Sequence, residues 1–236
     1  MAIKTEWIQL DAADGKFDAY VVTPHTGSGP GIVLIQEIFG VNEHIRTVAE
    51  QYAQDGFMVI VPDLFWRSEP RVELGYDESG WKRAVELMNA ADNSKAQADI
   101  SVAIDALKTR DGFTGPIAAI GYCWGGLLSY HTAANGLVDA AICYYGGGIQ
   151  NSLDRASEIE VPVLMLFGEE DSHIPMDAVH TIAKAFEDNE LVDIVSFTEA
   201  EHGFNCSHRD SYNQRAAVEA HGESLIFLSE MLQDQA

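Results

Sequence analysis

The sequence has few cysteines, no long apolar run and no recognisable leader. Its three cysteines are widely spaced and odd in number, which argues against a disulfide framework. Free thiols fit a reducing compartment, so we expect a cytoplasmic protein. No run is apolar for long enough to span a bilayer, and the first ten residues lack the apolar centre of a signal peptide. We therefore expect no membrane association.

Basic residues are also scarce. The chain has 14 Lys and Arg against 37 Asp and Glu, a formal net charge of −23. Such a surface repels phosphate backbones and excludes nucleic acid as a partner. It also opposes the long-range attraction of anionic small molecules. We expect a small-molecule substrate, no cofactor, and a monomer or small homo-oligomer.

The apolar pattern alternates between strand and helix. The 236 residues, 47% of them apolar, predict one α/β domain over residues 1–236. Residues 62–91 are irregular and then weakly helical, and Asn93 or Ser94 is the expected cap of the helix that follows. This order predicts a mostly parallel central sheet with helices on both faces. The expected strands are 5–10, 17–23, 31–38, 57–61, 117–120, 138–145, 161–167 and 192–197, and the expected helices are 43–54, 95–108, 176–186 and about 211–232.

A short glycine-rich turn separates the expected strand at 117–120 from a segment with helical spacing. It reads Gly121-Tyr122-Cys123-Trp124-Gly125, the pattern of a strained elbow that presents a nucleophile between a strand and a helix. A β-carbon at either glycine would collide with the neighbouring segment. The positive end of the helix favours a thiolate at Cys123. The alternative is an ordinary turn around a buried cysteine.

Two later strands end in loops that carry an acid and a base. Asp171 follows the strand at 161–167, and His202 follows the strand at 192–197. Glu169 and Glu170 lie beside Asp171 and are alternatives to it, and His202 is otherwise a surface histidine. The order nucleophile, acid, base is that of the α/β-hydrolase triad. In that reading His202 moves the thiol proton and Asp171 orients the imidazole.

Six motifs together resemble the dienelactone hydrolase family over nearly the whole chain. The resemblance implies an α/β-hydrolase fold without a large lid domain and the hydrolysis of lactones or esters by a cysteine nucleophile. The alternatives within this chemistry are a general carboxylesterase or a thioesterase. The motifs are Gln-Glu-Ile-Phe-Gly-Val-Asn at 36–42, Val-Pro-Asp-Leu at 61–64, Gly-Tyr-Cys-Trp-Gly-Gly at 121–126, Tyr-Tyr-Gly at 144–146, Gly-Glu-Glu-Asp at 168–171 and His-Gly-Phe at 202–204.

The resemblance also assigns three residues outside the triad. Glu37 matches an acid that contacts the resting cysteine in relatives and takes part in its activation when substrate arrives. A carboxylate in that place keeps a resting thiol protonated and less easily oxidised. The backbone N–H groups of Ile38 and Trp124 match the oxyanion hole, where donors face the developing charge.

The chain departs from relatives that act on a carboxylated lactone. Those relatives hold the substrate carboxylate with two arginines, at positions where this chain has Trp81 and Cys206. Lys82, Arg83 and Arg209 are nearby in the sequence, but a shifted cation is not the same clamp. We therefore expect neutral substrates. The expected substrate-binding residues are Phe39, Trp81, Arg83 and Tyr145, and the polar loop around Cys206 favours an exposed thiol.

Two other classes of function compete with hydrolysis. His202, Cys206 and His208 are residue types that bind zinc, although their spacing matches no known zinc motif and we expect no metal. A non-catalytic binding protein on a hydrolase scaffold is the second alternative, because fold does not imply function. The complete triad pattern argues against this second alternative.

Overall fold

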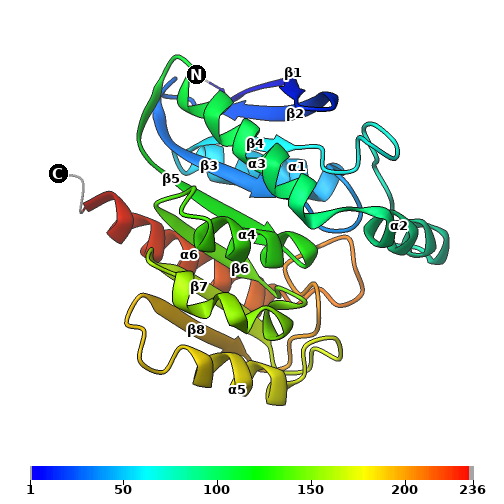
Figure 1. Cartoon of the computed structure of the whole chain (residues 1–236), viewed down its shortest axis with the longest axis vertical. Helices are drawn as coiled ribbons and strands as arrows, with labels where there is room; N and C mark the ends of the chain where they lie inside the picture. The colour runs from blue at the N-terminus through cyan, green and yellow to red at the C-terminus, as the bar shows by residue number, and fades with distance from the viewer. Residues whose placement is uncertain (1, 234–236) are drawn as a thin grey trace. The chain divides into compact units, whose positions relative to one another are not determined.

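A computed structural model of the chain describes residues 2–233 (Figure 1). Its eight strands follow the order β1-β2-β4-β3-β5-β6-β7-β8 in a mostly parallel sheet, as the sequence pattern predicts. The chain forms two compact units, the first ending at Ile117 and the second beginning at Ala118. A single domain over residues 1–236 stays a prediction. None of the helices described is long and apolar enough to cross a membrane.

The first unit begins with an antiparallel hairpin. β1 and β2 pair from Lys4 with Thr23 to Ala12 with Gly15, so a two-residue turn joins them. β2 then pairs antiparallel with β4, and β4 pairs parallel with β3. Helices α1 and α3 both pack on these strands. The elements are β1 Lys4–Ala12, β2 Gly15–Thr23, β3 Gly29–Ile35, β4 Met58–Pro62, α1 Glu43–Gln54, α2 Glu78–Ala90 and α3 Asn93–Lys108.

Several boundaries in this unit differ by one to three residues from the expectation, and two of them change how residues are placed. β3 ends at Ile35 rather than at residue 38, which leaves Glu37 in a loop. The buried side chain of Gln36 stabilises that loop, because its Oε1 accepts the N–H of Leu64 and its Nε2 donates to the carbonyl of Glu37. The N-cap of α3 is Asp92, whose carboxylate accepts two backbone N–H groups of the first turn. The expected caps Asn93 and Ser94 are already helical.

The second unit contains the carboxyl half of β5 and everything after it. β5, β6, β7 and β8 are parallel and in register, so their carboxyl ends lie at one edge of this part of the sheet. In Figure 1, α4 lies in front of these strands and α6 behind them. The elements are β5 Phe113–Tyr122, α4 Trp124–Ala134, β6 Ala140–Tyr144, the short 3₁₀ helices Ile149–Asn151 and Leu153–Glu158, β7 Val163–Gly168, α5 Met176–Ala185, β8 Val192–Phe197 and α6 Gln214–Gln233.

Candidate active site

Cys123 occupies a strained turn between β5 and α4. Its φ of 58° lies in the left-handed region that residues with a β-carbon rarely adopt, and it forms the N-cap of α4. A β-carbon at Gly121 would lie 1.9 Å from the carbonyl oxygen of Gly125, so only glycine fits there. The turn therefore has the backbone of the predicted elbow. The strained turn presents the thiol at the positive end of a helix.

Asp171 lies in the loop after β7 and is buried, whereas the neighbouring Glu169 and Glu170 are exposed. Its Oδ1 accepts the backbone N–H groups of His173 at 2.8 Å and Ile174 at 3.0 Å. Its Oδ2 lies 2.7 Å from Nδ1 of His202. Burial raises the pKa of Asp171, but these hydrogen bonds outweigh it, and the pKa is lowered. The carboxylate is thus ionised and accepts the Nδ1 proton of His202.

His202 lies in the loop after β8 and joins Asp171 to Cys123. Its buried imidazole forms hydrogen bonds with both residues. Burial lowers the pKa of His202, but negative charge on the sulfur of Cys123 and the contacts with Asp171 raise it well above its usual value. The imidazole is therefore a strong acceptor for the thiol proton of Cys123. The ion pair that this transfer forms can attack an electrophilic carbon without first transferring a proton to solvent.

Two rings contact the imidazole of His202 edge-on. The ring centroid of Tyr145 lies 5.1 Å away, and that of His173 lies 5.0 Å away. Burial, together with the positive charges of His202 and Arg209, lowers the pKa of His173. Tyr145 was expected near the site, but His173 was not. Its only signal was its position two residues after the acid, in the same loop.

The loop after His202 folds tightly on itself. Gly203 has a φ of 81°, and the guanidinium of Arg209 packs against it so closely that a β-carbon would clash. The N–H of Cys206 donates to the carbonyl of Gly203 at 2.9 Å. This turn buries Cys206 completely, so the expectation of an exposed thiol is wrong. Local polarity misled the prediction, because burial depends on how the loop packs and not on the polarity of its residues.

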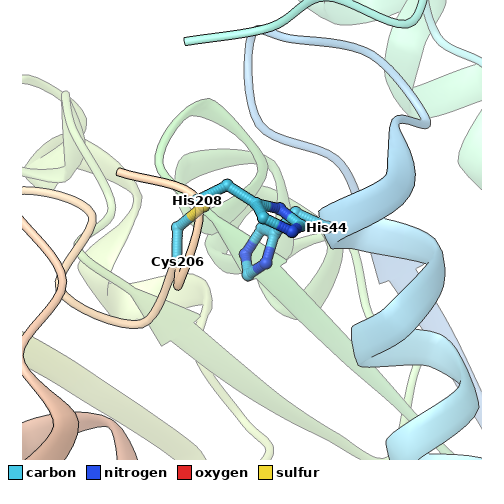
Figure 2. Close-up of side chains that lie close together, drawn as sticks. All are labelled: His44, Cys206 and His208. Atoms are coloured by element: carbon cyan, nitrogen blue, oxygen red, sulfur yellow. The ribbon is translucent and has the colours of Figure 1, made fainter. Parts of the chain in front are cut away.

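Cys206 and His208 lie close to each other, but His202 is not part of this cluster. A ligating atom of each lies within 4.8 Å of the other, and Figure 2 shows both side chains projecting from the loop after β8. The same figure labels His44, a buried residue of α1 in the first unit. His202 instead uses its ring for Asp171 and Cys123. The zinc hypothesis that grouped His202 with Cys206 and His208 therefore loses one of its three ligands.

The residues that the family resemblance assigns before the elbow lie in the first unit. Glu37 is fully buried directly after β3, and its Oε2 accepts a hydrogen bond from the hydroxyl of Tyr76 at 3.0 Å. Ile38 follows it and is also buried. Trp124 is the first residue of α4, in the second unit, where backbone N–H groups point out of the helix end. Tyr76 was not anticipated, because 39 residues separate it from Glu37.

The expected substrate-binding residues of the first unit differ in environment. Phe39 is buried, and its ring packs against Trp81 at 5.8 Å. Trp81, near the start of α2, keeps 38% of its surface exposed. Arg83 binds the carboxylates of Glu69 and Glu86 at 3.0 and 3.2 Å. The guanidinium already has anionic partners, and its role in substrate binding stays a prediction.

Known proteins with similar sequences cover nearly the whole chain. Residues 17–232 match the dienelactone hydrolase family. The carboxymethylenebutenolidase of Pseudomonas putida is 33% identical over 227 residues, which cover 95% of this chain and 96% of the relative. Carboxymethylenebutenolidase 1 of Cupriavidus pinatubonensis is 32% identical over 221 residues, which cover 93% and 94%.

Solved structures agree with the sequence comparison. A Klebsiella pneumoniae protein provisionally described as a dienelactone hydrolase superposes with a TM-score of 0.86 at 30% identity, over 97% of this chain and 99% of its own. An acylaminoacyl peptidase of Pyrococcus horikoshii, 16% identical, shares the fold alone, with a TM-score of 0.73 over 97% of this chain and 42% of its own. From these matches, the chain belongs to the dienelactone hydrolase family and is a hydrolase of the ester or lactone type.

Proposed function

We propose that the protein hydrolyses neutral esters or lactones through an acyl-enzyme intermediate on Cys123. One observation carries the proposal: the continuous hydrogen-bonded series from Asp171 through His202 to Cys123. The three side chains come from loops at the carboxyl ends of parallel strands, where α/β sheets bind their ligands. The curated relatives named carboxymethylenebutenolidase support a lactone as the first substrate to assay.

The reaction follows from the charges in the series. The thiolate of Cys123 attacks the carbonyl carbon, and the carbonyl electrons move to the oxygen. As this tetrahedral intermediate collapses, the bond to the leaving oxygen breaks and His202 donates its proton there. Neutral His202 then takes a proton from water, which attacks the thioester carbon. The C–S bond breaks, the carboxylic acid is released, and Cys123 leaves as the thiolate beside protonated His202. Asp171 holds Nδ1–H throughout, so Nε2 is the atom that exchanges the proton.

Two further roles belong to the same proposal. The backbone N–H groups of Ile38 and Trp124 stabilise the oxyanion, an effect typically worth 10²–10³-fold in turnover for one donor. Glu37 restrains the thiol of Cys123 in the resting enzyme and releases it when substrate arrives. The match of residues 36–42 to the family's motif supports this role.

Neutral substrates are favoured by the side chains at the family's arginine positions. Trp81 has an aromatic surface that stabilises an apolar group by burial, and Cys206 is buried and provides no guanidinium. An unpaired carboxylate taken out of water costs several kcal/mol. We therefore propose aryl or short acyl esters and uncharged lactones as the substrate class.

A panel of purified-enzyme assays tests the proposed function. Aryl esters, thioesters and lactones should separate a lactonase from a general carboxylesterase or thioesterase by their kcat/KM values. With a slowly deacylating ester, mass spectrometry should find the acyl group on the peptide that contains Cys123. Cys123→Ala should lose this adduct and nearly all turnover. Near-native turnover in Cys123→Ala would refute the nucleophile, and inertness toward every activated ester would favour the non-catalytic binding protein.

A further inference from the structure

The buried carboxylate of Glu37 is reached by a tyrosine from a distant loop. Tyr76 lies between β4 and α2, and its hydroxyl is 3.0 Å from Oε2 of Glu37. Its ring packs on Phe39 with centroids 4.5 Å apart. The segment just before Tyr76 is fixed to the same stretch of chain as Phe39, because the N–H of Leu74 donates to the carbonyl of Phe39 and Glu73 bridges to Gly40. These backbone contacts and the ring packing place Tyr76 beside Glu37.

Asn42 determines the direction of this hydrogen bond. Its Oδ1 accepts the N–H of Ile45 and caps α1, while its Nδ2 lies 3.1 Å from both the carbonyl of Leu74 and the hydroxyl of Tyr76. A carbonyl only accepts, so the amide orientation is settled by its two backbone partners. Asn42 must then donate to the oxygen of Tyr76. The hydroxyl proton is left to point at Glu37.

We propose that Tyr76 is a positioning residue for Glu37, and that Asn42 keeps its hydroxyl in the donating orientation. The proposal rests on the role of Glu37 in the proposed function. With Oε2 held by Tyr76, the orientation of the carboxylate is restrained. Without the hydroxyl, Glu37 can turn, and its restraint of the resting thiol weakens.

Tyr76→Phe removes the hydroxyl and keeps the ring that packs on Phe39. The readouts are the rate of Cys123 alkylation by iodoacetamide from pH 5 to 9, and kcat and KM for an aryl ester. We expect alkylation near pH 7 to become about tenfold faster and kcat to fall about tenfold, the effect of losing one hydrogen bond to a charged group. Glu37→Gln should change both quantities in the same direction.

The double variant separates positioning from a general structural role. If Tyr76 acts through Glu37, Tyr76→Phe should change neither alkylation nor kcat further once Glu37→Gln is present. Tyr20→Phe is the matched control, since it removes a tyrosine–glutamate hydrogen bond of 2.7 Å to Glu50 in the same unit. This control should leave alkylation and kcat at wild-type values.

Three results from the variants that contain a tyrosine substitution would overturn the inference. They are additive effects in the double variant, a wild-type alkylation profile in Tyr76→Phe, or equal changes in Tyr20→Phe. If Glu37→Gln itself leaves the alkylation profile unchanged, the restraint by Glu37 is refuted and the positioning role is refuted with it. Hydrolysis by the wild type and its loss in Cys123→Ala, measured in the same series, report separately on the proposed function.

Discussion

Each unit of the protein contains a buried aspartate that is hydrogen-bonded to a basic side chain. The two pairs have similar geometry. In the first unit, Asp99 of α3 accepts hydrogen bonds from both terminal nitrogens of Arg67 and from the indole N–H of Trp66. In the second unit, Asp171 binds His202 and two backbone N–H groups. Both carboxylates are almost fully shielded from solvent.

The partners make the difference between the two pairs. Arg67 binds Asp14 as well as Asp99, and these contacts raise a pKa that is already far above physiological values. Its proton never leaves, so the pair can only stabilise the fold. His202 can gain and lose a proton, and it touches a strained cysteine. A buried carboxylate is thus not a sign of catalysis until a titratable partner stands beside a nucleophile.

The same substitution at both sites should have the most contrasting effect on turnover. In Asp171→Asn, the amide oxygen still accepts the two backbone N–H groups, so the amide nitrogen faces Nδ1 of His202. The imidazole then carries its proton on Nε2 and cannot accept one from the thiol. We expect kcat to fall about 10⁴-fold, while Asp99→Asn keeps kcat within about threefold. Steady-state kinetics on the folded fraction measure both, and a comparable loss in Asp99→Asn would contradict the distinction.

The free energy of unfolding should be affected in the reverse order, with a larger loss in Asp99→Asn than in Asp171→Asn. Asp99→Asn leaves Arg67 and Trp66 with a partner that has lost its charge and one acceptor oxygen. We expect the free energy of unfolding to fall by about 3 kcal/mol, as when one member of a buried ion pair is removed. Urea unfolding followed by tryptophan fluorescence provides the measurement. A smaller loss than in Asp171→Asn would show that the first pair is not the structural one.

The two pairs should also differ in how pH affects their contribution to stability. The pKa of His202 is raised to about 10 in the folded protein, above its ordinary value of 6.5. Its stabilisation is therefore fully present below pH 6.5 and is lost as pH rises toward 10. Relative to His202→Gln, the wild type should lose roughly 4 kcal/mol of its advantage between pH 6 and pH 10. The difference in the free energy of unfolding between the wild type and Arg67→Gln should stay constant over the same pH range.

A control isolates the cause of that shift. Among the interactions that raise the pKa of His202, the attraction to negative charge on Cys123 is the strongest. Repeating the pH series in a Cys123→Ala background should shift the loss to lower pH. An unchanged midpoint would mean that Asp171 alone sets the titration.

Substrate charge should give the smallest effect. The arginines described in the first unit already pair with carboxylates of that unit, so none of these guanidinium groups is reserved for a substrate anion. These pairs are Arg46–Glu73, Arg67–Asp99, Arg71–Asp18, Arg83–Glu69 and Arg110–Glu6. We expect a lactone methyl ester to exceed its free acid about tenfold in kcat/KM, since an imperfectly paired buried charge costs over ~1 kcal/mol.

The double variant Trp81→Arg with Cys206→Arg should shift this preference toward the acid. A wild-type preference for the acid would contradict the expectation and implicate Arg209 or Lys82. Arg209 is the cation to examine first, because it acts electrostatically on His173 beside the triad.

Features that depend on neighbouring residues were predictable from the sequence. The strand before Cys123, the helix after it and the glycine at 121 follow from apolar spacing and from the space that a β-carbon needs. The order of Cys123, Asp171 and His202 along the chain pointed to a triad. Successive parallel strands place their carboxyl ends at one edge of the sheet. The proximity of the residues that follow those ends can therefore be predicted from strand order alone.

Only the tertiary structure decided which of several equivalent side chains takes part. Glu169, Glu170 and Asp171 are adjacent acids, and the path of one loop selects Asp171 by burying it under His202. The burial of Cys206 and the contact of Tyr76 with Glu37 depend in the same way on how loops pack. Sequence spacing encodes local backbone geometry, whereas a contact between distant loops depends on packing that no short segment specifies.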